Sequence, residues 1–271
     1  MRALDFEYDG FRLSDFGCII CTFDSPGTES YSVGSQISYE TVPVDSGKIN
    51  YFVSSQYEDC IEAEFQICKN VERMMDNNDK YFTLDEQSEI TRWLNRRHFL
   101  PLTIINEGYE NIYFEGSFNV QKYEVAGNVI GFVLTLTTNK PFALSRQYSH
   151  RFEITDPTKQ IINVHDISDE IGYAYANLEI ECKSNGTLSI TNDMDKRVTE
   201  IKNCKSGEKI TITSNLCIDT SLGTHKSTIM NDFNFNFLRI SNKLENRNNR
   251  LKFSMPCKVY LTYSPIRKVG I

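Results

Sequence analysis

Alternation of apolar and polar residues, with a period of two, dominates the chain. In the segment IEAEFQI, Ile61, Phe65 and Ile67 share one face of an extended strand, whereas Glu62 and Glu64 share the other. This pattern is typical of a strand with one buried face and one solvated face. It recurs in ANLEIECK (176–183), in TLSIT and KITIT around 188–190 and 210–212, and in FNFNF (233–237). The alternation therefore predicts antiparallel strands in a two-layer or barrel fold.

Further strands are predicted at 112–120, 129–137 and 258–263, with Ala126-Gly127-Asn128 as a turn before the second of them. The alternation stops around Pro141-Phe142, and 145–156 is polar and irregular before strands resume near Tyr173. We therefore expect two domains, an N-terminal one at 1–144 and a C-terminal one at 145–271.

One segment has helical rather than strand periodicity. Thr83 followed by Glu86 matches a capping box, in which each side chain satisfies a free backbone N–H at the start of a helix. Ile90, Trp93 and Leu94 then form an apolar stripe, and Pro101 is the expected stop signal. The pattern predicts a helix at 84–98 that covers an open face of a sheet, with Arg96, Arg97 and His98 in solvent or at an interface.

The basic residues at the end of that helix raise the question of whether it is a nucleic-acid-binding or catalytic element, and the net charge of the chain argues against nucleic-acid binding. The 271 residues carry a formal net charge of −7, which works against broad phosphate binding, so we expect no nucleic-acid recognition. Residues 1–20 hold several acidic side chains among apolar ones, and no apolar run of 18 residues follows. We therefore expect a soluble chain without a secretory leader and without membrane insertion.

Candidate chemistry is sparse. Cys18 and Cys21 form a C-x-x-C in FGCIICTF, but Ile19 and Ile20 favour a strand, which places the two sulfurs on opposite faces. Packed, reduced cysteines are the simpler interpretation for this pair and for the other cysteines of the first half, Cys60 and Cys68.

Other motifs are equally weak. The four histidines, His98, His150, His165 and His225, stand far apart, and the segment 191–195 resembles a hairpin turn more than a calcium loop. Asn185-Gly186-Thr187 has the form of a glycosylation sequon but is expected to be a turn. The chain contains no nucleophile elbow, phosphate-binding loop, dinucleotide fingerprint or H-E-x-x-H motif. We therefore expect no catalytic residues, no cofactor and no metal site, and hence no enzyme.

Several segments, in order, resemble a known family. The opening FEYDGFRLSDFGCII resembles the start of the distal tail proteins of long-tailed bacteriophages, in which a hydrophobic strand, a turn around a Gly and an SDFG-like segment recur. The helix with Trp93-Leu94 is similar to the single helix of that family's N-terminal domain. YFEGSFNV, GFVLTLTTNKPFAL and VYLTYSPIRKVGI are similar to later segments of the family in the same order.

The resemblance implies a mainly β fold. Its N-terminal part would be a sandwich-like or barrel-like β domain with one helix, and its C-terminal part a β-sandwich that resembles galectins or carbohydrate-binding modules. It further implies a homohexameric ring that joins the tail tube protein to the tail-tip protein and serves as the hub for receptor-binding proteins. The product would be made in the bacterial host cytoplasm and end in the virion, as part of a phage or prophage tail.

Two other functions stay open at the level of sequence. One is a carbohydrate-binding protein of host recognition, whose C-terminal sandwich would hold sugar on an aromatic platform such as Tyr173, Tyr175 or Phe237. The other is a β-sandwich glycosidase, which needs two carboxylates about 5 to 10 Å apart in a cleft.

Overall fold

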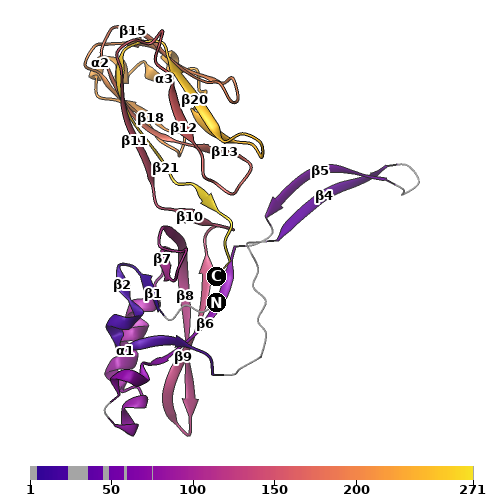
Figure 1. Ribbon diagram of the computed structural model, residues 1–271, viewed down its shortest axis with the longest axis vertical. Coiled ribbons are helices and arrows are strands. Elements are labelled where there is room, and N and C mark those ends of the chain that lie inside the picture. The colour runs from indigo at the N-terminus through magenta and orange to yellow at the C-terminus, as the bar shows by residue number, and fades with distance from the viewer. Residues whose placement is uncertain (1–4, 24–35, 45–48, 58–59, 75, 271) are drawn as a thin grey trace. The chain divides into compact units, whose positions relative to one another are not determined.

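The chain forms two compact units of mainly β structure. The computed structural model describes residues 5–23, 36–44, 49–57, 60–74 and 76–270. One unit comprises Met1–Leu144 with Lys268–Ile271, and the other comprises Ser145–Arg267. Strands predominate in both units, as the alternation predicted (Figure 1). Within the described ranges, no helix is long and apolar enough to span a membrane.

The first unit is built on one sheet with the strand order β2-β1-β7-β8-β9-β6-β3. Its strands are β1 (Asp5–Tyr8), β2 (Phe11–Arg12), β3 (Cys18–Cys21), β6 (Glu62–Lys69), β7 (Leu100–Ile105), β8 (Ile112–Val125) and β9 (Asn128–Thr138), with the short β10 (Ala143–Ser145) beside β8. Short 3-10 helices lie at Leu13–Phe16, Val71–Arg73 and Asn77–Lys80. The strands predicted around 61–67, 112–120 and 129–137 are confirmed. The predicted turn joins β8 to β9, and Ala126 and Gly127 both have positive φ there, +51° and +80°.

Helix α1 (Leu84–Leu94) covers the core of this sheet. It begins at the predicted capping box, where Thr83 N donates to Glu86 Oε2 (2.7 Å) and Glu86 N donates to Thr83 Oγ1 (3.3 Å). Trp93 is 4% exposed, and its indole N–H donates to the carbonyl oxygen of Tyr8 on β1 (2.9 Å). Its ring stacks on Phe16 with centroids 4.3 Å apart. The predicted packing role of this helix is therefore confirmed.

The helix ends earlier than predicted. It stops at Leu94 rather than at residue 98, and Asn95 leaves the helical region with φ −80° and ψ 84°. The physical reason is that the buried stripe ends at Leu94, so no apolar contact holds the polar residues after it in a helix. Pro101 is not the stop signal either, because it lies inside β7, where it pairs with Glu115 of β8.

The second unit is a β-sandwich. Its five-stranded sheet has the order β11-β21-β14-β17-β18, and its four-stranded sheet has the order β12-β20-β15-β16. The strands are β11 (Tyr148–Ile154), β12 (Ile162–His165), β14 (Asn177–Cys182), β15 (Gly186–Asn192), β16 (Val198–Cys204), β17 (Lys209–Ile212), β18 (Ile218–Thr220), β20 (Asn248–Phe253) and β21 (Cys257–Tyr263). A separate pair consists of β13 (Gly172–Tyr175) and β19 (Arg239–Asn242), and β22 (Ile266–Arg267) follows β21. The inward side chains of the two larger sheets form one apolar core.

Two sequence predictions in this unit were wrong. The polar stretch 145–156 contains the edge strand β11, whose outer face is charged, and only Phe152 and Ile154 mark its inner face. The stretch 233–237 is not a strand, because the chain turns at Phe235, which has φ +55°. Asn234 stabilises the turn: its side chain accepts from Glu200 N (3.1 Å) and donates to the carbonyl oxygen of Val198 (2.9 Å). The hairpin turn predicted at 191–195 is confirmed between β15 and β16.

Helices α2 (Gly223–Lys226) and α3 (Ile229–Asp232) follow β18. A buried polar cluster holds them: the Glu208 carboxylate accepts from the backbone N of Lys205 (2.8 Å) and from the hydroxyl of Thr220, and lies 2.5 Å from His225 Nδ1. Asp232 lies 3.5 Å from the other ring nitrogen of His225. The side chains of Glu208 and His225 are 0% and 3% exposed, so this cluster supports the fold rather than facing a substrate.

Candidate functional sites

An exposed β-hairpin is the most unusual surface of the molecule. Strands β4 (Ile37–Val44) and β5 (Ile49–Tyr57) pair with each other from Ile37↔Tyr57 to Val44↔Ile49, with a bulge after Glu40. In the described part of the chain, neither strand pairs with any other (Figure 1). We call this element the β4–β5 hairpin.

The distal half of the β4–β5 hairpin exposes apolar side chains on both faces. Tyr39 and Phe52 meet on one face, with ring centroids 6.4 Å apart. Cross-strand pairs place Val42 opposite Tyr51 and Val44 opposite Ile49 on the other face. The side chains are largely exposed, from 41% for Val44 to 64% for Tyr39, with Val42, Ile49, Tyr51, Phe52 and Val53 between these values.

Two physical properties of such a hairpin favour contact with another surface. An isolated two-stranded hairpin is marginally stable in water, and contiguous exposed apolar surface is typical of protein–protein interaction sites. Strands at the edge of a sheet also offer backbone hydrogen-bonding groups to a further strand. The β4–β5 hairpin therefore has the properties of a segment that packs against another protein surface.

The sequence interpretation missed this element. The signal was present in SYETVPV and INYFVSS, which are rich in β-branched and aromatic residues. The clean alternation of a half-buried strand is absent, however, because Val42, Val44, Tyr51 and Ile49 are apolar on the face where a solvated strand would carry polar residues.

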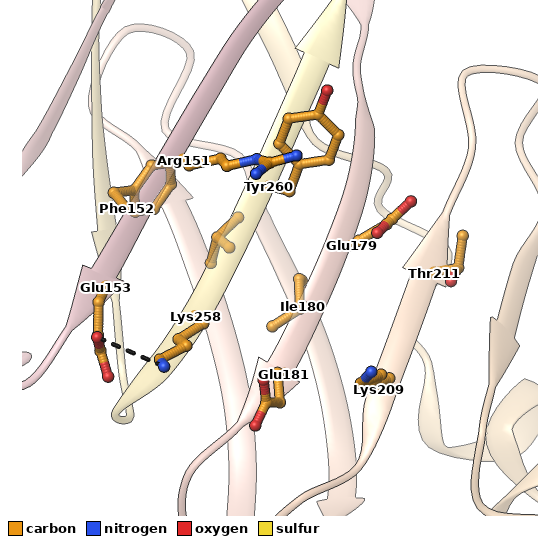
Figure 2. A pocket seen from close by; sticks show the side chains of 11 residues that line it. Arg151, Phe152, Glu153, Glu179, Ile180, Glu181, Lys209, Thr211, Lys258 and Tyr260 are labelled. Carbon is orange, nitrogen blue, oxygen red and sulfur yellow. Dashed lines mark ion pairs between the residues drawn. The ribbon is translucent and has the colours of Figure 1, made fainter.

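A second candidate surface is a groove on the outer face of the five-stranded sheet in the second unit. Its volume is about 570 Å³, and strands β11, β21, β14 and β17 all contribute side chains to it (Figure 2). Cross-strand pairing arranges its charged residues in two rows. The first row runs Glu153–Lys258–Glu181–Lys209, and the second runs Arg151–Tyr260–Glu179–Thr211.

The first row compensates its own charges. Lys258 lies 3.8 Å from Glu153, the pair joined by the dashed line in Figure 2. Glu181 is paired with Lys183, and this hydrogen bond, with the nearby Lys258 and Lys209, lowers the pKa of its carboxyl. Along this row each charge lies beside a charge of opposite sign.

The second row differs. The Arg151 guanidinium lies over the ring of Tyr260, 4.6 Å from its centroid (Figure 2). Glu179, on the far side of Tyr260, makes no side-chain hydrogen bond or ion pair with any residue that the structure describes. A donor that lies over an aromatic ring and an acceptor without a partner among the described side chains thus share one open face.

The aromatic platform expected from the sequence does not form. Phe237 is buried at 8% exposure. The rings of Tyr175 and Phe237 pack in a T-shaped arrangement, with their centroids 6.4 Å apart. Tyr173 is exposed, but the Arg239 guanidinium covers one face of its ring at 3.8 Å. Arg239 also donates to Tyr175 Oη (3.1 Å), which lowers the pKa of that phenol.

Cys18, Cys21 and Cys68 lie on two paired strands, β3 and β6, and the thiols of Cys21 and Cys68 are in hydrogen-bonding contact. Cys18 and Cys21 lie on β3, as predicted, and Cys18 is buried whereas Cys21 is not fully covered. Burial raises the pKa of the Cys18 thiol to about 12, which makes it a poor nucleophile. Within the described ranges, no group of three or more His, Cys, Asp and Glu side chains is arranged to hold a metal ion.

The histidines are also separate. His225 belongs to the buried cluster, His165 Nδ1 lies 2.8 Å from Asn248 Oδ1, and His98 is exposed in a loop. Burial lowers the pKa of His150 on β11.

Two β units with an exposed apolar hairpin are typical of proteins that assemble with other proteins. Family models agree with that class: residues 1–140 match the phage tail protein N-terminal domain, and residues 142–263 match the phage tail C-terminal domain. The chain belongs to this phage tail protein family, and it is therefore a structural component of a phage tail and of the virion.

A solved structure has the same fold. The chain matches the crystal structure of SPP1 Dit (gp 19.1), described as a paradigm of the hub adsorption apparatus in phages that infect Gram-positive bacteria. The TM-score is 0.65 at 10% sequence identity, over 97% of this chain and 99% of that one. No curated protein sequence matches the chain. The resemblance to distal tail proteins drawn from short sequence segments is thus confirmed.

Proposed function

We propose that this chain is the hub of a phage tail tip, a homohexameric ring that joins the tail tube protein to the tail-tip protein and carries receptor-binding proteins. The observation that carries the proposal is the full-length match in fold to a protein described as an adsorption hub. On this proposal the chain is not an enzyme, needs no cofactor, and is made in the host cytoplasm before it enters the virion.

The β4–β5 hairpin supplies the contact between copies in this proposal. Its apolar faces belong to one chain, and the surface that covers them would belong to the next, so the interface is of the head-to-tail kind that closes into a ring. Edge strands of the hairpin could also extend a sheet of the neighbour through backbone hydrogen bonds. A domain of 1–144 that forms the ring and a separate sandwich that faces partners would divide these tasks.

The test is the mass of the purified full-length protein in light scattering, alone and with tail partners. A ring of six copies of the 31.3 kDa chain would give about 188 kDa. The paired substitution Val42→Lys with Tyr51→Lys places two charges on one exposed face of the hairpin, and we expect it to yield a folded monomer. Leu244→Lys is the matched control, because Leu244 is 78% exposed and lies outside the hairpin.

The outcomes separate the parts of the proposal. A wild-type protein that stays monomeric at high concentration and with tail partners contradicts the ring. A ring that survives the paired substitution contradicts the role of the hairpin, and a closed assembly of another size contradicts the number six.

A further inference from the structure

The second row of the groove has the composition of a binding site. Arg151, Tyr260 and Glu179 lie directly opposite one another on β11, β21 and β14. Adjacent strands are about 4.8 Å apart, so the backbones that carry Arg151 and Glu179 are roughly 10 Å apart. No ion pair joins Arg151 to Glu179, whereas Lys258 and Glu153 of the first row are paired.

The guanidinium of Arg151 is restrained before any ligand arrives. The cation–π contact with Tyr260 restrains it, and its N–H groups remain available to donate, since Arg151 makes no side-chain hydrogen bond or ion pair with the residues that the structure describes. Glu179 offers only acceptors, because an ionised carboxylate carries no proton to donate. The hydroxyl of Thr211, which can donate and accept, extends the row beyond Glu179.

The charge of the groove limits what can bind. Three basic side chains, Arg151, Lys209 and Lys258, face three acidic ones, Glu153, Glu179 and Glu181. An anion would meet three carboxylates and a cation would meet three basic groups, so neither is favoured. A neutral ligand with hydroxyls that accept from Arg151 and donate to Glu179 meets no such repulsion.

We propose that this groove binds a neutral carbohydrate, with Arg151 and Glu179 as hydrogen-bonding partners of its hydroxyls and Tyr260 as the support that orients Arg151. The volume of about 570 Å³ falls within the range of small-molecule sites and accommodates a short oligosaccharide. The site is distinct from the β4–β5 hairpin, so the proposal does not depend on ring assembly.

The test uses the full-length protein in saturation-transfer NMR with a panel of neutral disaccharides, lactose, maltose, cellobiose and N,N′-diacetylchitobiose, each at millimolar concentration. Inorganic phosphate and a sialylated trisaccharide are the anionic competitors. We expect at least one neutral sugar to bind, and the separate changes Arg151→Ala and Glu179→Gln to weaken its binding by about tenfold or more, since each removes a hydrogen bond to a charged group. Tyr260→Ala should weaken it as well, through loss of the support under Arg151.

Two matched variants serve as controls. Tyr173→Ala removes an exposed tyrosine on β13, and Glu200→Gln neutralises a carboxylate on β16, both outside the groove. Thermal unfolding should show that all five variants are folded. Absence of binding by every neutral sugar overturns the proposal, as does a preference for the anionic probes. Equal binding loss in the control variants would assign any binding to another surface and also overturn it.

Discussion

Trp93 carries the sharpest prediction about stability. Its ring lies between the helix and the sheet, stacked on Phe16 at 4.3 Å and on Phe6 at 5.7 Å, and only 4% of its surface is exposed. Trp93→Ala therefore removes the main contact between α1 and the aromatic core of the first unit.

The magnitude follows from two contributions. Truncation of a buried tryptophan costs about 3–5 kcal/mol through lost burial and a residual cavity. Loss of the indole N–H also leaves the Tyr8 carbonyl without its 2.9 Å partner, which adds about 1 kcal/mol. We expect the free energy of unfolding of the first unit to fall by about 4–6 kcal/mol, a large part of the stability of a typical domain. Trp93→Phe keeps a ring but loses the N–H, so its cost should be about 1–2 kcal/mol.

Urea titration followed by hydrogen-exchange mass spectrometry measures this effect, because the substitution removes the only tryptophan and its fluorescence. Peptides from β7 to β9 should lose protection at much lower urea, whereas peptides from β14 and β17 serve as an internal reference in the other unit. Leu84→Ala is the matched control, since Leu84 lies on the same helix but is 76% exposed. If Trp93→Ala lost no more protection than Leu84→Ala, the assignment of α1 as a packed cover of the sheet would be wrong.

Three further predictions concern the first unit. Thr83→Ala removes the helix cap and should lower the free energy of unfolding by about 1 kcal/mol, as measured by urea titration. Partial burial alone would raise the pKa of Glu86, but hydrogen bonds from Lys69 and Thr83 outweigh it and lower that pKa. The stabilising effect of these hydrogen bonds should be present above the unfolded-state pKa of about 4.3 and be lost as the pH falls below it. Urea titrations between about pH 6 and 3 test this: the free energies of unfolding of wild type and Lys69→Met should converge at the acid end. Gly131→Ala would place a Cβ 2.4 Å from a backbone oxygen of β6 and should lower the melting temperature clearly more than Gly116→Ala, whose closest contact is a flexible leucine side chain.

Local features of the fold were predictable from sequence because the interactions that fix them are local. The capping box at Thr83 and Glu86 and the turn at Ala126-Gly127 involve residues within three positions of one another. The end of α1 was not predictable in the same way, because it depends on where tertiary burial stops, after Leu94. The same limit applies to the segment 233–237. Its apolar and polar residues alternate as in a strand, but the chain turns there, and the side chain of Asn234 makes hydrogen bonds to the backbone of Glu200 and Val198.

The candidate sites depended on pairing over long sequence distances. Arg151, Tyr260 and Glu179 come from three strands, and only the register of the sheet places them in one row. The β4–β5 hairpin was hidden for a different reason, since apolar residues such as Val42 and Tyr51 occupy the face that is normally polar in a solvated strand. A pattern search for half-buried strands passes over an element that is apolar on both faces.

The path of the chain has a consequence for the order of folding during translation. Residues from Lys268 onward return to the first unit, where Val269 packs on its core and Tyr109 donates a hydrogen bond to the carbonyl oxygen of Gly270 (2.8 Å). These residues leave the ribosome only after the whole sandwich, Ser145–Arg267, has been synthesised. The unit at the N-terminal side therefore cannot make its last core contacts until the residues of the sandwich have been synthesised, so the usual N-terminal-first completion of domains does not apply to it.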